Sequence, residues 1–167
     1  WTITYAGLNL EIAPTTFKHT GLFPEHASSW KWMQNTIARA SQQSHRTEPV
    51  SVLNLFGYTG AASLACAQAG AKVTHVDGSK VSVAWAKRNQ KLSQIPEDSI
   101  RWIIDDAITF IKREIKRGKK YDAIVMDPPS HGRGPTGEVW EIERDLSKLL
   151  GLCCELLSDK PVFVLLN

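Results

Sequence analysis

The sequence has few of the features that mark membrane, metal-binding or disulfide-rich secreted proteins. It contains no apolar run of the roughly 20 residues that a membrane-spanning helix requires. No basic segment followed by an apolar one stands at its start, as a secretion signal would need. Internal repeats and low-complexity tracts are also missing. These absences predict an ordinary globular domain without a membrane partner.

Cysteine is scarce, with Cys66, Cys153 and Cys154 alone among 167 residues. They form no Cys-x-x-Cys pair and show no spacing typical of metal ligands. We therefore expect small, buried apolar residues in a reducing compartment, the cytoplasm, and we predict no metal site.

Neither sign of charge is in large excess. The formal net charge is +3 at pH 7, which permits an anionic partner without requiring one. Basic residues are densest in one short stretch, at Lys112, Arg113, Lys116, Arg117, Lys119 and Lys120. This stretch is either a solvated helix face or a contact for nucleic-acid phosphate.

The N-terminal part differs in pattern from the rest. Its first 13 residues form two short alternating runs around an Ala-Gly pair, typical of a β-hairpin. Prolines and a glycine then make the chain irregular. We predict a hairpin and loop at residues 1–25 and a Rossmann-like domain at residues 26–167, which opens with a helix at 26–43. Because the chain begins at Trp1, we expect the natural N-terminus to lie upstream.

From residue 50 onward, strand-like and helix-like segments alternate with short connections. We expect strands at 50–56, 72–77, 99–105, 121–127 and 161–167, and helices at 60–70, 79–92, 107–117 and 141–157. This cadence predicts an α/β fold with a doubly wound, mainly parallel sheet and helices on both faces. Ligands of such sheets bind beyond the carboxyl ends of the strands, so the residues there are the candidate site.

The first of these strand ends reads NLFGYTG, residues 54–60. Gly57 and Gly60 allow a sharp turn and a close approach of the backbone to a ligand. Thr59 can cap the helix that follows. Because two glycines do not make the full G-x-G-x-x-G fingerprint, a tight turn without a ligand is the alternative.

Acidic residues end the next two strands. Asp77 is placed to bind both hydroxyls of a ribose, or else to cap the following helix. Asp105 and Asp106 precede Ala107, and one of the two can cap a helix while the other faces the pocket. We favour Asp106 as the acceptor for an exocyclic amino group such as that of adenine, with helix capping as the alternative.

The fourth strand ends in Asp127-Pro128-Pro129, before a glycine-rich loop. Proline has no N–H and stiffens the backbone, so an acid and a carbonyl can be held rigidly as two acceptors. The edge of a flipped nucleobase offers a matching amino group or ring N–H. A simple strand stop is the alternative, but three other ligand-like strand ends in one sheet favour a functional role.

Taken in order, NLFGYTG, HVD, DDA and DPP resemble the motifs of class I S-adenosylmethionine-dependent methyltransferases. The segment FKHTGLFPE, residues 17–25, and the run GRGPTGEVW narrow the resemblance to bacterial methyltransferases of large-subunit ribosomal RNA. The resemblance covers nearly the whole chain. It implies S-adenosyl-L-methionine as cofactor and an RNA base as substrate, methylated by direct transfer. Nitrogen methylation fits better than ring-carbon methylation through a thiol, since none of the cysteines lies at a strand end.

The resemblance also implies roles for individual residues. Residues 54–60 would hold the methionine part, Asp77 the ribose and Asp106 the adenine, while Asp127 and Pro128 would face the substrate. The candidate cofactor-binding residues are Phe23, Asn54, Phe56, Gly57, Tyr58, Thr59, Gly60, Asp77, Ser79, Asp105, Asp106, Ala107 and Asp127. The candidate catalytic residues are Asp127, Pro128, Pro129 and His131.

The sequence departs from the family pattern in two places. His131 stands where the family often has an aromatic residue on which a base can stack; imidazole can also stack, and an exposed loop histidine is the alternative. The chain ends with the fifth strand at Asn167, so we expect the C-terminal hairpin of the fold to be missing and the domain to be truncated. Two other functions stay open, an NAD(P)-dependent oxidoreductase and a noncatalytic nucleic-acid-binding module.

Overall fold

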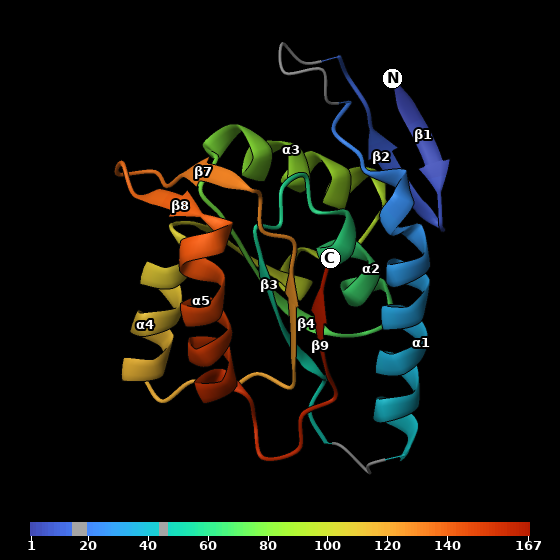
Figure 1. Cartoon of the computed structure of the whole chain (residues 1–167). Helices are drawn as coiled ribbons and strands as arrows, with labels where there is room; N and C mark the ends of the chain where they lie inside the picture. Colours follow the sequence, from blue (N-terminus) through green and yellow to red (C-terminus); the bar gives the residue numbers. More distant parts are fainter. Residues whose placement is uncertain (15–19, 44–46) are drawn as a thin grey trace.

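Five parallel strands form the central sheet of the computed structural model, which describes residues 1–14, 20–43 and 47–167 (Figure 1). They are β3 (Ser51–Leu55), β4 (Lys72–Asp77), β5 (Ile100–Ile104), β6 (Ala123–Met126) and β9 (Phe163–Leu166). Their order is β5-β4-β3-β6-β9, and all pairs are parallel. The chain runs outward from β3 to β5 and then returns to place β6 on the other side of β3. The strand order thus reverses between β3 and β6, which puts the ligand-binding crevice at their carboxyl ends.

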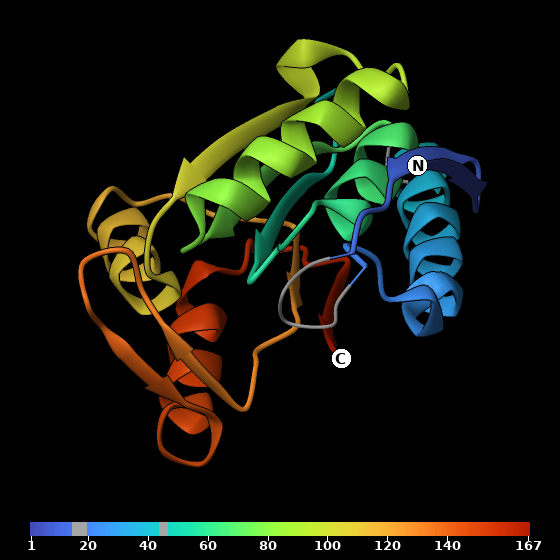
Figure 2. The same ribbon diagram turned by 90° about the horizontal axis from the view of Figure 1, so that it is seen from above.

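Helices cover both faces of this sheet, as the sequence predicts (Figures 1 and 2). The helices α1 (Ala27–Gln43), α2 (Ala61–Gln68) and α3 (Lys80–Leu92) lie on one face, and α4 (Ala107–Lys116) and α5 (Ile142–Leu156) on the other. Successive strand residues point to opposite faces of the sheet and belong to two separate hydrophobic cores. Val52 lies in the same core as Met33, and Leu53 lies in the same core as Leu149. Because both faces are covered, the central strands are apolar along nearly their whole length.

The N-terminal hairpin is present. Strands β1 (Thr2–Tyr5) and β2 (Leu8–Glu11) pair antiparallel, joined by a turn in which Ala6 and Gly7 both have positive φ, as a tight two-residue turn requires. Leu8 and Leu10 are at most 1% exposed and belong to the same core as Trp30. The division of the chain between residues 25 and 26 stays a prediction.

A second hairpin was not predicted. Where the sequence indicated an irregular glycine-rich loop, β7 (His131–Arg133) pairs antiparallel with β8 (Val139–Glu141). The turn between them is closed by hydrogen bonds from the N–H of Gly134 to the carbonyl of Glu138 and from that of Gly137 to the carbonyl of Gly134. Strands of three residues flanked by glycine and proline carry too little alternation to be recognised in a sequence.

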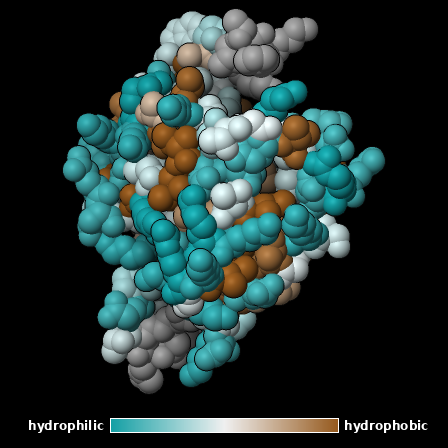
Figure 3. All heavy atoms as spheres, turned by 90° about the vertical axis from the view of Figure 1, so that its left-hand side faces the viewer, coloured by the Kyte–Doolittle hydropathy of each residue, from teal (hydrophilic) through white to brown (hydrophobic). Residues whose placement is uncertain are grey.

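Among the described residues, two short 3₁₀ helices complete the elements, η1 (Pro24–His26) before α1 and η2 (Glu97–Ser99) before β5. The outer face of α4 and α5 is largely hydrophilic, with apolar residues gathered between the polar ones (Figure 3). Within the part of the chain that the structure describes, no helix is both long and apolar enough to cross a membrane.

Candidate active site

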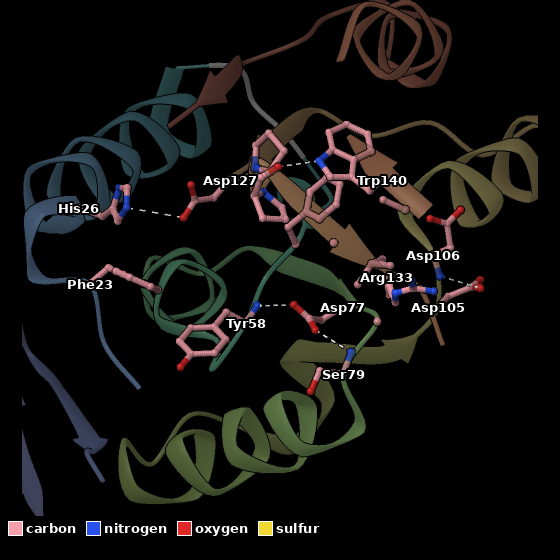
Figure 4. Close-up of a pocket in the computed structure, with 18 of the residues that line it drawn as sticks. Phe23, His26, Tyr58, Asp77, Ser79, Asp105, Asp106, Asp127, Arg133 and Trp140 are labelled. Atoms are coloured by element: carbon pink, nitrogen blue, oxygen red, sulfur yellow. Dashed lines mark hydrogen bonds and ion pairs between the residues drawn. The ribbon is translucent and has the colours of Figure 1, made fainter. Parts of the chain in front are cut away.

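A cavity of about 480 Å³ lies at the carboxyl ends of β3, β4, β5 and β6 (Figure 4). It brings together eleven of the predicted residues: Phe23, Phe56, Tyr58, Asp77, Ser79, Asp105, Asp106, Ala107, Asp127, Pro128 and Pro129. A smaller cavity of about 50 Å³ shares Phe23, Tyr58 and Asp127 with it and is also lined by Asn54, Gly57 and Thr59. Gly60 and His131 line neither cavity.

The loop after β3 has an unusual backbone. Phe56, Tyr58 and Gly60 have φ values of 55°, 49° and 91°, a region that costs about 1–3 kcal/mol for residues other than glycine. Position 57 also requires glycine, but for a steric reason. A Cβ at Gly57 would lie 2.3 Å from the ring of His75. The loop is therefore pressed onto β4, and its strain is of the kind found at ligand sites.

Thr59 does not cap α2, and that interpretation was wrong. The N-cap is Gly60, without a side-chain hydrogen bond, while the hydroxyl of Thr59 donates to the carbonyl of Gly21 at 2.6 Å. A Cβ at Gly21, where φ is +88°, would meet the ring of Trp85 at 2.3 Å. Thr59 thus ties the β3–α2 loop to the segment that carries Phe23.

Asn54 lies beneath this loop in a buried hydrogen-bond chain. Its side-chain amide donates to the hydroxyl of Ser63 at 2.8 Å, and that hydroxyl lies 2.9 Å from Nδ1 of His75. Burial lowers the pKa of His75 to about 3, although a backbone contact with Tyr58 acts in the opposite direction. The imidazole is therefore neutral, and the chain supports the floor of the loop.

Asp77 joins two loops at the centre of the cavity. One carboxylate oxygen accepts from the N–H of Tyr58 and the other from the N–H of Ser79, both at 2.8 Å. Burial raises the pKa of Asp77, and the two N–H groups offset part of that rise. The N-cap of α3 is Ser79 rather than Asp77. Each carboxylate oxygen can accept a second hydrogen bond, which leaves Asp77 able to bind a pair of hydroxyls.

The two acids after β5 have different partners. Asp106 is the N-cap of α4 and accepts from the N–H of Thr109 at 2.8 Å. Asp105 forms an ion pair with Arg113 and accepts from the N–H of Asp106 at 3.0 Å. Asp106 therefore caps a helix and also lines the cavity, so the two interpretations of this residue are compatible.

Asp127-Pro128-Pro129 forms another wall of the main cavity. Burial raises the pKa of Asp127, while His26 lowers it and Glu25 raises it. The carbonyl of Pro129 accepts from Nε1 of Trp140 at 2.6 Å. Because the indole already uses one lone pair of this carbonyl, we expect the carbonyl of Pro128 to be the one that meets a substrate.

Four lining residues of chemical interest were missed from the sequence: Glu25, His26, Arg133 and Trp140. His26 directly follows FKHTGLFPE and Trp140 ends GRGPTGEVW, so the neighbouring motifs were the available signal. His131 is exposed on β7, and its stacking role stays a prediction. Residues 17–19 of the upstream motif lie outside the described residues. Among those described, no group of three or more His, Cys, Asp or Glu side chains could hold a metal ion.

Comparison with known proteins finds a matching family model and similar sequences. A family model described as Conserved hypothetical protein 95 matches residues 26–150. The chain is 32% identical to the Ribosomal RNA large subunit methyltransferase K/L of Shewanella sp. (strain MR-4), over 98% of the chain and 22% of that relative.

Solved structures agree with these sequence matches. The crystal structure of an S-adenosylmethionine (SAM)-dependent methyltransferase from Agrobacterium tumefaciens has a TM-score of 0.91 and 46% identity, covering 99% of this chain and 51% of that one. A structure of SMU.776 complexed with SAH has a TM-score of 0.85 and 27% identity, covering 100% of this chain and 42% of that one. This chain thus spans about half or less of the length of these proteins.

Proposed function

Because the chain belongs to the family described as Conserved hypothetical protein 95, we propose that it transfers a methyl group from S-adenosylmethionine to a base of ribosomal RNA. The resemblance to class I methyltransferases is confirmed by the methyltransferase names of the relative and of the Agrobacterium structure. The observation that carries the proposal is geometric. Asp77 ends β4, while Asp106 and Asp127 follow the ends of β5 and β6. All three line one cavity at the switch point of the sheet.

The cavity fits a nucleoside cofactor. Its volume of about 480 Å³ is within the range of roughly 300–1,000 Å³ that ligand pockets usually have. In this proposal Asp77 accepts from the ribose hydroxyls, Asp106 accepts from the adenine amino group, and the strained loop at residues 56–60 holds the methionine end. The SAH in the structure of SMU.776 supports the same ligand class here.

S-adenosylmethionine supplies a methyl group already activated on a positively charged sulfur. What the chain contributes is orientation. The carboxylate of Asp127 and the carbonyl of Pro128 form two acceptors that can hold the amino edge of a flipped base. Alignment of the attacking atom with the methyl group is worth up to about 7–11 kcal/mol of the barrier.

A covalent route through a cysteine thiol has no support. None of the three cysteines lines either cavity. Cys66 and Cys153 are buried as expected, whereas Cys154 is exposed, so the expectation was wrong for that residue. Burial raises the pKa of Cys66 to about 12, so its thiol stays protonated and is a poor nucleophile. Direct transfer to nitrogen is therefore the chemistry that we propose.

We propose ribosomal RNA as the partner and the cytoplasm as the compartment. The relative named a ribosomal RNA methyltransferase supports both. In the basic stretch of α4 and the residues directly after it, Arg113 and Arg117 are exposed but form ion pairs with Asp105 and Glu114. Lys112, Lys116 and Lys119 are also exposed. These three lysines are the candidates for contact with RNA phosphate.

The test uses the full-length protein and ribosomal RNA from cells that lack its gene. We expect transfer of radiolabelled methyl groups to the RNA, mapped to one nucleotide by mass spectrometry. Asp127→Asn should retain S-adenosylhomocysteine affinity but lose about 10²–10⁴-fold in turnover. A protein that binds NAD instead, or that methylates no RNA, would contradict the proposal.

A further inference from the structure

We propose that His26 holds Asp127 in place and receives the proton that Asp127 removes from an amino group of the target base. This inference rests on the proposed function. It adds a positioning residue, His26, and a substrate class, a base nitrogen that bears hydrogen.

The two side chains meet where the cavities adjoin (Figure 4). Nε2 of His26 lies 3.5 Å from Oδ2 of Asp127, and the side chains are 23% and 43% exposed. Both residues line both cavities. A proton taken up by Asp127 therefore has an imidazole beside it and water beyond, which is the arrangement that a relay to solvent needs.

Several contacts fix His26 in this position. It ends η1, and its N–H donates to the carbonyl of Phe23 at 3.2 Å. Its ring lies edge-on to Phe23 at 6.1 Å, and Phe23 lies 5.6 Å from the ring of Tyr58. The same segment is tied to the β3–α2 loop through the hydrogen bond between Thr59 and Gly21. His26 is thus positioned by the loop that we assign to the cofactor.

The charges around the pair act on Asp127 in opposite directions. Burial raises the pKa of Asp127, His26 lowers it and Glu25 raises it. Imidazole is the side chain that most readily exchanges protons near neutral pH. The other titratable groups that line the main cavity are Tyr58, Asp77, Asp105, Asp106 and Arg133. Among the charged groups that line the cavity, His26 lowers the pKa of Asp127 and Glu25 raises it.

The step balances without a further reactant. As the nitrogen–methyl bond forms, the carbon–sulfur bond breaks and its electron pair stays on sulfur. The nitrogen–hydrogen bond breaks, its electron pair stays on nitrogen, and the proton passes to Asp127. From there it moves to His26 and then to water. A ring nitrogen that attacks through a lone pair has no proton to lose, so it would not need this pair.

Two substitutions of opposite effect test the inference in the full-length protein. His26→Gln removes the imidazole that lowers the pKa of Asp127, so that pKa should rise further and the acid limb of the pH–rate profile should move to higher pH. We expect a shift of about one pH unit, an estimate for half-exposed charges, and hence about a tenfold lower rate on that limb. Glu25→Gln removes the anionic neighbour and should move the same limb to lower pH.

Single-turnover transfer to RNA gives the rate profiles, and carbon-13 NMR of the Asp127 carboxyl follows its titration directly. Affinity for S-adenosylhomocysteine and the melting temperature should stay near those of the wild type, which separates the effect from misfolding. If RNA is methylated while both profiles and both titrations stay unshifted, the role of His26 is overturned. If the wild-type protein methylates no RNA, the proposed function itself fails.

Discussion

Asp77 shows how one side chain serves both the fold and the proposed site. Its two oxygens accept from backbone N–H groups of Tyr58 and Ser79, which fixes the β3–α2 and β4–α3 loops relative to each other. Each oxygen can accept a second hydrogen bond, and Asp77 lines the cavity, where a ribose would place two hydroxyl donors. A neutral amide cannot replace this carboxylate, because its NH₂ group would face a backbone donor.

We therefore expect Asp77→Asn to lower affinity for S-adenosylhomocysteine by about 10- to 100-fold, as the loss of charged hydrogen bonds predicts. Isothermal titration measures this change. Asp98→Asn is the matched control, because Asp98 is 78% exposed and pairs with Lys72 outside the cavity. Equal affinity in both variants would show that Asp77 does not bind the ligand.

Glu114 is a second acid whose environment decides its role, here in stability. Its side chain is 1% exposed and accepts from Tyr121 and Arg117, both at 2.8 Å. Burial alone would raise the pKa of Glu114, but these hydrogen bonds and the nearby Arg101 outweigh it, so the pKa is lowered. A lowered pKa means that the carboxylate stabilises the folded state at neutral pH and stops doing so in acid.

Glu114→Gln should thus lower the free energy of unfolding by about 2 kcal/mol at pH 7. The difference from the wild type should shrink as the pH falls below the ordinary pKa of glutamate, about 4.3, because the lowered pKa of Glu114 delays its protonation to more acidic pH. Urea unfolding at several pH values measures both effects. Glu155→Gln, at an exposed position of α5, should change stability by less than about 0.5 kcal/mol. A difference that grows in acid would contradict the assigned sign.

At the level of elements, the β7–β8 hairpin forms one wall of the cavity. Trp140 of β8 lies opposite Gly132 of β7 in the register, packs against the ring of Phe56 at 5.0 Å and donates to the carbonyl of Pro129. A Cβ at Gly132 would lie 3.3 Å from Pro129, so the hairpin sits directly on the Asp-Pro-Pro segment. The hairpin thereby holds the acceptors that the substrate would meet.

Trp140→Phe keeps an aromatic ring beside Phe56 but deletes the hydrogen bond to Pro129. We expect a loss of about 1 kcal/mol in unfolding free energy and a fall in the methyl-transfer rate that is larger than any change in cofactor affinity. Single-turnover rates and isothermal titration separate the two. Trp32→Phe, at a side chain that is 47% exposed on α1, should leave both unchanged. Equal losses in rate and affinity would place Trp140 at the cofactor instead.

The sequence predicted the elements that have strong periodicity. All five parallel strands, the helices between them and the N-terminal hairpin were expected, and the strand ends located the cavity. The β7–β8 hairpin was not predicted, because strands of three residues are too short to show a recognisable alternation of apolar and polar residues. Thr59 was misread because its long-range partner, Gly21, cannot be inferred from local capping rules. His26 and Trp140 were missed for the same reason, since each reaches Asp127 or Pro129 from a distant segment.

For the molecule as a whole, the N-terminal hairpin and the sheet domain share one core. Leu8 and Leu10 pack in the cluster that contains Trp30, Met33 and Val52, and Glu11 of β2 accepts from Trp85 and Arg88 of α3. The hairpin leads into the segment with Phe23 and His26, so its packing bears on the site. These contacts favour unfolding of both parts together, although the sequence pattern divides them at residue 25.

Leu10→Ala tests this cooperation. Because Leu10 is 1% exposed, truncation should lower the unfolding free energy by about 2–5 kcal/mol. If the two parts unfold as one unit, hydrogen exchange should quicken by the same factor for the slowest amides of β2 and of β3, which no local fraying of the hairpin would produce. Val81→Ala, at a side chain that is 74% exposed on α3, should leave both sets of amides unchanged. Faster exchange confined to β1 and β2 would mean that the hairpin opens independently, and that His26 is held by its own contacts with Phe23 and the β3–α2 loop.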